Sequence, residues 1–283
     1  MLKILSDHYK AVIYVIIAVL CLSLHDLLSK KLNQNYTIFM ILWFRYLFHF
    51  SYALITGKGV IKESRFKKIH FFRAILMTSI GLSFITGLKY LPLSEATAIN
   101  FLAPSLVLLL SFVFLKEKIT STEILKVAVG FLGILLIARP GGDIFKFEII
   151  FPMLAALFFA VYQILTKIVG NSENSLISNY YLGLYALLLS STFLPLSFST
   201  IDPIDLLFFF LVGAFGTFAH TLFNKAYILE SPAKLSPYSY FQILFATVWG
   251  VTFFNSIPDI YTSIGILIII SSGINIHLRK NEH

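Results

Sequence analysis

Long apolar stretches recur along the whole chain, and they constrain the fold more than any other feature of the sequence. A helix that crosses the hydrocarbon core of a bilayer, about 30 Å thick, needs about 20 mainly apolar residues. With 58% hydrophobic and 13% charged residues among 283, the chain leaves no room for a soluble domain. Ten stretches of suitable length occur, at about 11–31, 38–56, 70–90, 92–115, 121–138, 148–169, 176–196, 206–227, 232–254 and 260–277.

Backbone groups inside a bilayer must be hydrogen-bonded within the protein, so a spanning segment is a helix or part of a closed barrel. The stretches lack the ten-residue alternation that is typical of barrel strands. The sequence therefore predicts an all-α integral membrane protein with ten transmembrane helices.

No small-residue cleavage site follows the first stretch, which predicts an uncleaved first helix. The single cysteine, Cys21, excludes a disulfide framework and a cysteine metal cluster.

Basic residues are distributed unequally between the two predicted sides of the membrane. If the N-terminus is inside, sixteen of the 22 lysines and arginines lie at the inner side, five lie at the outer side, and Arg45 lies within a helix. This is the positive-inside bias of membrane proteins. Both termini are therefore predicted to be cytoplasmic, and the net charge of +8 does not indicate a nucleic-acid partner. A reporter fused to His283 that is active only outside the cell would contradict this orientation.

The two halves of the chain carry a weak internal repeat. A shift of 138 residues places LPLSEATAINFLAPSLVLLLSFVFLKE on LESPAKLSPYSYFQILFATVWGVTFFN, and a shift of 137 places SLHDLLSKK on AVYQILTKI. Residues 1–140 and 144–283 then form two units of five predicted helices each. Because five is odd, the second unit crosses the membrane in the opposite sense. Inverted repeats with a substrate site near the midplane are typical of secondary transporters.

Helix-breaking and polar residues lie near the middle of the fourth stretch, in SEATAINFLAP. The ring of Pro104 removes one backbone hydrogen bond and clashes with the carbonyl four residues earlier, that of Asn100. The freed carbonyl and the Asn100 side chain are then two polar groups at mid-membrane, where unsatisfied groups are costly. We predict that Asn100, Phe101 and Pro104 contact the substrate. The alternative is that Pro104 only kinks the helix and Asn100 binds a neighbouring helix.

The ninth stretch has a similar break, where Pro237 frees the carbonyl of Ala233. The segment SPYSYFQ then supplies Tyr238, Tyr240 and Gln242. Aromatic faces suit a flat organic ligand, and hydroxyl and amide groups orient it. These three residues are therefore predicted to bind the substrate.

Ionisable residues within the first two stretches are predicted to pair. Asp26 and Arg45 lie at the same predicted depth, and buried charges in lipid are costly unless they are paired. His49 lies one turn from Arg45 on the same face, whereas His25 is expected to point about 100° away from Asp26. The Asp26–Arg45 pair is read as a fixed clamp between the two helices. The alternative is that Asp26 or a histidine couples transport to protons.

Three further polar residues are candidates for the site. Glu95 lies in the first turn of the fourth helix, where an acid either caps the helix dipole or faces a vestibule and titrates. His220 and Asn224, one turn apart in the eighth stretch, either bind other parts of the protein or contact the ligand. The chain has no H-E-x-x-H sequence and no paired-aspartate motif. No catalytic residues, metal site or cofactor are therefore predicted.

The most distinctive stretches resemble the EamA-like family of the drug/metabolite transporter superfamily. They are LPLSEATAINFLAPSLVLLLSFVFLKEKIT, GFLGILLIARPG, LSPYSYFQILFATVWGVTFFNSIPD and, at 43–48, WFRYLF. The resemblance covers nearly the whole chain as two five-helix units. It is closest to branches described as riboflavin transporters and S-adenosylmethionine uptake transporters. It implies a central cavity between predicted helices 1, 3, 4, 6, 8 and 9, in agreement with the placement of Asn100, His220 and Tyr238.

The sequence thus predicts a secondary transporter that moves a small organic metabolite across the inner membrane. Transport would depend on a gradient or on exchange, since the chain has no phosphate-binding loop. Aromatic residues and few buried acids favour riboflavin; S-adenosylmethionine uptake or export of an amino-acid-type metabolite are the alternatives. An integral membrane enzyme acting on lipid-linked substrates is the alternative from another class. The predicted partners are the solute and the lipid bilayer, and a homodimer stays open.

Overall fold

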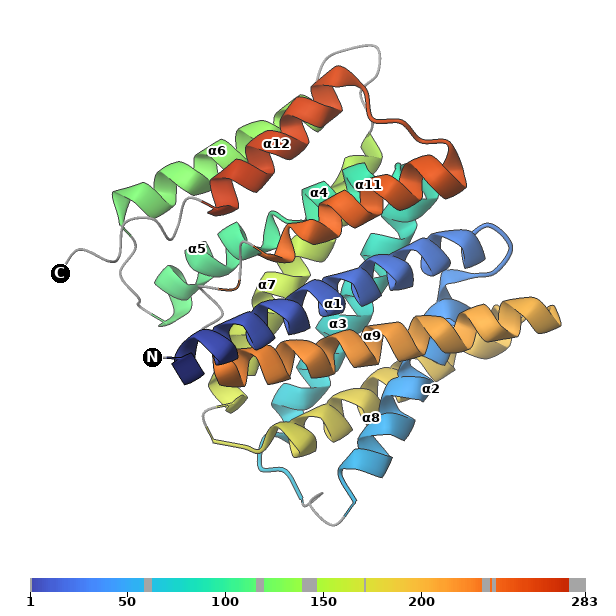
Figure 1. Cartoon of the computed structure of the whole chain (residues 1–283). Helices are drawn as coiled ribbons and strands as arrows, with labels where there is room; N and C mark the ends of the chain where they lie inside the picture. Colours follow the sequence, from blue (N-terminus) through green and yellow to red (C-terminus); the bar gives the residue numbers. More distant parts are fainter. Residues whose placement is uncertain are drawn as a thin grey trace.

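The computed structural model describes residues 2–58, 63–115, 120–138, 147–170, 172–230, 235 and 238–274. These residues form helices and contain no strand (Figure 1). Two short 3-10 segments also occur: η1 Phe147–Ile149 precedes α7, and η2 Leu194–Leu196 follows α8. The helices are α1 Leu2–Leu32, α2 Ile38–Thr56, α3 Lys67–Tyr90, α4 Leu93–Asn100, α5 Ala103–Leu115, α6 Ser121–Ala138, α7 Ile150–Gly170, α8 Ser175–Phe193, α9 Pro203–Leu229, α11 Phe241–Phe254 and α12 Ile260–Ile274.

Six segments are long and apolar enough to cross a membrane, by length and composition. They lie in α1, α2, α3, α4 with α5, η1 with α7, and α9. Shorter apolar helices occur at Val127–Ile137, Phe241–Phe254 and Ile260–Ser272. Helix α8 is less apolar because it carries four serines, one asparagine and three tyrosines in 19 residues. The predicted class, a helical integral membrane protein, is confirmed.

Helices from the two predicted units interleave rather than forming two separate bundles (Figure 1). Helix α1 packs along α9, and α3 packs along α7. Helix α9 also contacts α2, as α3 contacts α8. Three further pairs, α2 with α8, α4 with α11 and α6 with α12, join the units directly. Exchanging the two five-helix units turns the α1–α9 contact into the α7–α3 contact and the α2–α9 contact into the α8–α3 contact. The last three pairs each join equivalent helices of the two units.

The fourth apolar stretch is broken where the sequence predicts a break. Helix α4 ends at Asn100 and α5 begins at Ala103. Across the break the backbone tightens, because the N–H of Leu102 bonds to the carbonyl of Ile99. The turn that precedes α11 lies at Tyr240, the position that the shift of 138 residues gives to Leu102. The breaks therefore occur at equivalent positions of the two units.

The largest apolar core surrounds this break. It joins α1, α3, α4, α7, α11 and α12 through residues such as Leu88, Ile99, Ala155 and Ile243. A second core lies between α2, α3, α8 and α9. The site described next lies among the same helices as these cores, and is built from the polar side chains that point inward.

Candidate functional site

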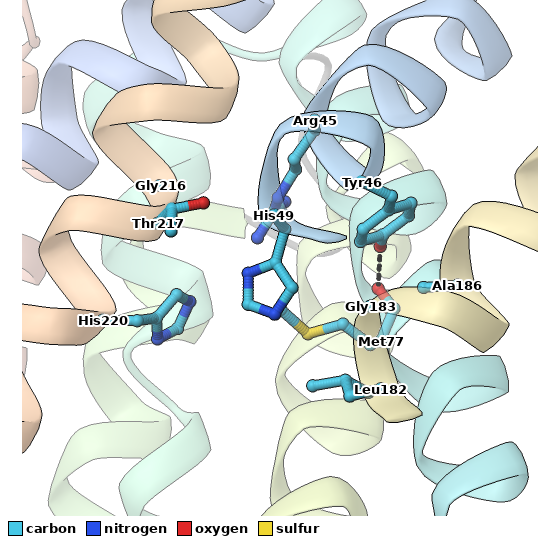
Figure 2. A pocket seen from close by; sticks show the side chains of 10 residues that line it. All are labelled: Arg45, Tyr46, His49, Met77, Leu182, Gly183, Ala186, Gly216, Thr217 and His220. Carbon is cyan, nitrogen blue, oxygen red and sulfur yellow. Dashed lines mark hydrogen bonds between the residues drawn. The ribbon is translucent and has the colours of Figure 1, made fainter. Parts of the chain in front are cut away.

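A narrow cavity lies between α2, α3, α8 and α9 (Figure 2). Its free space would hold about one water molecule. Its lining includes one arginine and two histidines, Arg45, His49 and His220, all three predicted from the sequence. His49 from α2 and His220 from α9 point into the same space from opposite sides (Figure 2). The remaining lining residues, Tyr46, Met77, Leu182, Gly183, Ala186, Gly216 and Thr217, were not predicted.

The predicted Asp26–Arg45 ion pair is wrong. Asp26 is 5% exposed, and its carboxylate accepts a hydrogen bond from Gln242 Nε2 at 3.0 Å. Its other oxygen lies 2.9 Å from His25 Nδ1. His25 therefore does not point away from Asp26, as one helical step suggested. Among the residues that the structure describes, no ion pair or hydrogen bond joins Asp26 to Arg45.

The position of α9 explains this difference. Helix α9 packs against both α1 and α2, and its residue Gly216 lies between their polar side chains. A Cβ atom at Gly216 would lie 3.4 Å from His25 Cδ2 and 3.9 Å from Arg45 Nε. His25 and Arg45 thus approach the same point on α9. Asp26 and Arg45 have the same predicted depth in the membrane, but α9 occupies the space between them.

Several buried side-chain polar atoms of helices α1 to α4 have no hydrogen-bond partner among the described residues. Asn100 Oδ1, at the end of α4, is one of them, as its place beside Pro104 predicts. Such atoms are costly inside a membrane protein unless another group binds them. The other atoms of this kind are His25 Nε2, Ser29 Oγ, His49 Nε2, Thr78 Oγ1 and Thr97 Oγ1.

The broken segments bring the two predicted aromatic groups together. The rings of Phe101 and Tyr240 lie 5.0 Å apart, centroid to centroid. Tyr240 is buried, and Gln242 follows it at the start of α11. Pro104, in contrast, is exposed on α5. Its position indicates a role in the break itself.

Three other predicted residues lie apart from the cavity or cannot be placed. Tyr238 packs with Ala11 and Val15, in the apolar cluster around the first half of α1. Glu95 is buried in the first turn of α4, within electrostatic range of Lys30. The Lys30 ammonium donates to the carbonyls of Leu88 and Leu91 at the end of α3. The side chain of Asn224 and all of Pro237 lie outside the described residues.

A second buried polar cluster, which the sequence analysis missed, joins the beginnings of α3 and α8 to the end of α7. Arg73 is 1% exposed and bonds to four side chains: His70, Thr166, Ser178 and Tyr162. His70 Nε2 lies 2.6 Å from Glu173 Oε1. The sequence counts Arg73 only as a basic residue at the inner side. Its burial depends on partners about 90 or more residues away, which no local pattern reveals.

Comparisons with known proteins agree with this arrangement. The model of the EamA-like transporter family matches residues 9–139 and again residues 146–276. An S-adenosylmethionine uptake transporter of Rickettsia prowazekii (strain Madrid E) is 26% identical over 270 residues. The aligned region covers 94% of this chain and 92% of the relative. A riboflavin transporter of Brucella anthropi is 27% identical over 232 residues, covering 80% and 81% of the two chains. The predicted resemblance is confirmed.

A solved structure supports the fold independently of these names. It superposes with a TM-score of 0.61 and covers 96% of this chain and 95% of its own. Its sequence identity is 16%, so the likeness concerns the fold alone.

Proposed function

Because the chain belongs to the EamA-like transporter family, we propose that it is a secondary transporter that carries a small organic metabolite across the inner (plasma) membrane. One observation carries the proposal. A row of polar side chains runs from half-buried Gln242 through buried Asp26 and His25 to half-buried Arg45, beside Gly216, across helices of both units. Ionisable residues in membrane-spanning helices are expensive, and they mark the paths of solutes and protons.

The proposal includes ten transmembrane helices in two inverted repeats, residues 1–140 and 144–283, with both termini cytoplasmic. Two observations support it. The helix contacts are equivalent when the two units are exchanged, and both units break at equivalent positions, Leu102 and Tyr240. A reporter fused to His283 would test the orientation. Activity only on the outer side would contradict it.

S-adenosylmethionine is the first candidate solute. Relatives with that name in four Rickettsia species cover at least 88% of this chain. S-adenosylmethionine carries a sulfonium and an ammonium group, and Asp26 supplies a buried carboxylate that could neutralise a cation. The touching rings of Phe101 and Tyr240 offer apolar faces for its adenine.

Riboflavin is the second candidate, because a relative with that name covers 80% of this chain. Its isoalloxazine ring would suit the same aromatic pair, Phe101 and Tyr240. It carries no cation for Asp26, which is why we place it second. The sequence-based preference for riboflavin is therefore reversed in this proposal.

Uptake of labelled solutes into liposomes that contain the purified protein tests the function. We expect saturable uptake of S-adenosylmethionine, with riboflavin measured in parallel and an imposed pH gradient as a second condition. Chromatography of the trapped label would then show whether the solute is unchanged. Chemical conversion of the label would support the membrane enzyme instead. Absence of any uptake of both solutes would contradict the proposed substrates.

The proposal needs neither a cofactor nor a second copy of the chain. All residues of the polar path come from one chain, and both units contribute to it. The cavity at Arg45 is nearly closed in this structure. Rocking of one unit against the other would have to widen it before a solute of this size could enter.

A further inference from the structure

Arg45 is a permanent cation that lacks a counter-ion among the residues that the structure describes. It lies near the middle of α2, and no hydrogen bond or ion pair joins it to another residue of the described ranges. Its one close contact with an aromatic ring, 5.8 Å from the guanidinium to the centroid, is with the adjacent Tyr46. A cation in the interior of a membrane protein is costly unless it is paired.

The neighbours of Arg45 do not supply an anion either. The other lining residues include no carboxylate, and their polar members are Tyr46, His49, Thr217 and His220. His49 Nε2 is buried without a hydrogen-bond partner. Asp26 lies beyond His25 and is already bound by His25 and Gln242. An anion that reached the cavity would therefore meet Arg45 and the unpartnered Nε2 of His49, and no carboxylate of the lining.

We propose that Arg45 binds the carboxylate of an amino-acid-type substrate, with His49 and His220 beside it. The inference rests on the proposed transport function and narrows its substrate class. A planar guanidinium matches a carboxylate with two parallel hydrogen bonds. One permanent cation balances one negative charge, so a monoanion fits better than a phosphate dianion. The cavity is small in this structure, but a carboxylate group has three heavy atoms and needs little space.

The two charged residues then bind opposite ends of a zwitterion. Arg45 lies on one side of His25, at Gly216, and Asp26 lies on the other. A metabolite that carries a carboxylate and a separate cationic group matches two charges that lie on opposite sides of His25. S-adenosylmethionine has both groups, whereas riboflavin has neither. Arg45 would therefore favour S-adenosylmethionine over riboflavin, because only S-adenosylmethionine has a carboxylate.

Two ligands that differ only in the carboxylate provide the test. S-adenosylmethionine and its decarboxylated form share the adenosine, the sulfonium and the amine. We would measure equilibrium binding of both to the full-length protein in lipid nanodiscs, by competition with labelled S-adenosylmethionine. Wild type should bind the decarboxylated form at least about tenfold more weakly, which is the size expected for a lost charge-assisted hydrogen-bond pair.

The variant Arg45→Gln, measured with the same two ligands, completes a double-mutant cycle between the side chain and the carboxylate. It should weaken S-adenosylmethionine binding at least about tenfold and leave the decarboxylated form nearly unchanged, because only the first ligand loses a partner. Arg45→Lys should keep part of the discrimination, since it keeps the charge but loses the paired geometry. Lys31→Gln is the matched control, because Lys31 is an exposed cation against the ring of Phe208. It should bind both ligands as wild type does.

Three outcomes would overturn the inference. They are equal binding of the two ligands to wild type, an equal loss of both in Arg45→Gln, and binding of riboflavin without binding of S-adenosylmethionine. If Arg45→Gln does not fold, Arg45→Lys alone decides, through the same ratio of affinities. Binding with the expected ratio but without uptake would contradict the proposed function and leave Arg45 as a carboxylate-binding residue. Uptake of S-adenosylmethionine by a protein that binds both ligands equally would support the proposed function and contradict the role of Arg45.

Discussion

Asp26 shows how one buried side chain can be both costly and useful. It is almost fully buried in α1, and it binds His25 of the same helix and Gln242 of the other unit. A carboxylate in such surroundings is stable only because hydrogen bonds replace its hydration. Asp26 can exchange either partner for a cationic solute group, since each partner is held by a single hydrogen bond. Asp26 is therefore suited to release and regain its internal partners during transport.

The substitution Asp26→Asn should separate charge from shape. Asparagine has nearly the same size and still accepts a hydrogen bond from Gln242, so the fold should persist. We expect uptake of a cationic solute to fall at least about tenfold, as for loss of one charge-assisted interaction. Asp7→Asn, which removes an acid from a surface pair with Lys10, is the control. Normal uptake by Asp26→Asn would show that the carboxylate does not contact the solute.

Arg73 is the residue whose removal should cost the most stability. Its guanidinium has four side-chain partners, and truncation would leave several buried polar groups without a partner. Arg73→Gln should lower the free energy of unfolding by about 3 kcal/mol, the size typical of a broken buried charged network. Arg65→Gln, at a nearby exposed arginine, should change it little. Thermal unfolding in detergent would measure both, and equal midpoints would argue against this role.

At the scale of elements, close packing of helices depends on small residues. Helices α6 and α12 approach so closely that a Cβ atom at Gly133 would lie 2.8 Å from the carbonyl oxygen of Gly265. A Cβ atom at Gly265 would lie 2.7 Å from the carbonyl oxygen of Gly133. Backbones that touch in this way are typical of helix pairs in membranes.

Gly133→Ala should therefore destabilise the α6–α12 pair. The added methyl group meets backbone, which cannot move aside as a flexible side chain can, and overpacking of this kind costs about 1–3 kcal/mol. Gly250→Ala is the matched control, because its nearest contact, the carbonyl oxygen of Ser256, lies at an ordinary 3.7 Å. Unfolding in a graded detergent series would compare the two. Equal stability of both variants would contradict the close approach.

At the scale of the whole molecule, the two units are joined by polar contacts at both ends. At one end, Tyr36 donates a hydrogen bond to Asp205 at 2.8 Å. At the other end, His70 and Arg73 of the first unit bind Glu173 and Ser178 of the second. Alternating access would require these contacts to break in turn. The nearly closed cavity at Arg45 is consistent with a structure in which both sets are formed.

Glu173→Gln should open the end that contains His70. The variant removes the carboxylate bound to His70 and should shift the population towards the open form. The reporter is Ser64→Cys in a Cys21→Ala background, because buried Ser64 lies beside Tyr181, which stacks on His70. We expect thiol labelling to become at least about threefold faster. Glu63→Gln, at an exposed acid paired with Lys67, is the control. An unchanged labelling rate would show that Glu173 does not hold this end closed.

The sequence by itself determined the features that depend on local composition. Apolar stretches of membrane length predicted the helices, because a bilayer accepts few other structures. Pro104 predicted the break between α4 and α5, since a missing N–H and a ring clash act within one turn. Asn100, His49, His220 and Gln242 were also singled out as polar residues within the apolar stretches.

Only the tertiary structure decided which of these side chains meet. Depth along a helix can be read from residue number, but the direction in which a side chain points, and what lies between two helices, cannot. Asp26 and Arg45 therefore matched in depth and still did not pair, because α9 passes between them. For the same reason the Arg73–His70–Glu173 cluster stayed hidden. Its members are ordinary polar residues until packing brings three distant segments together and excludes water.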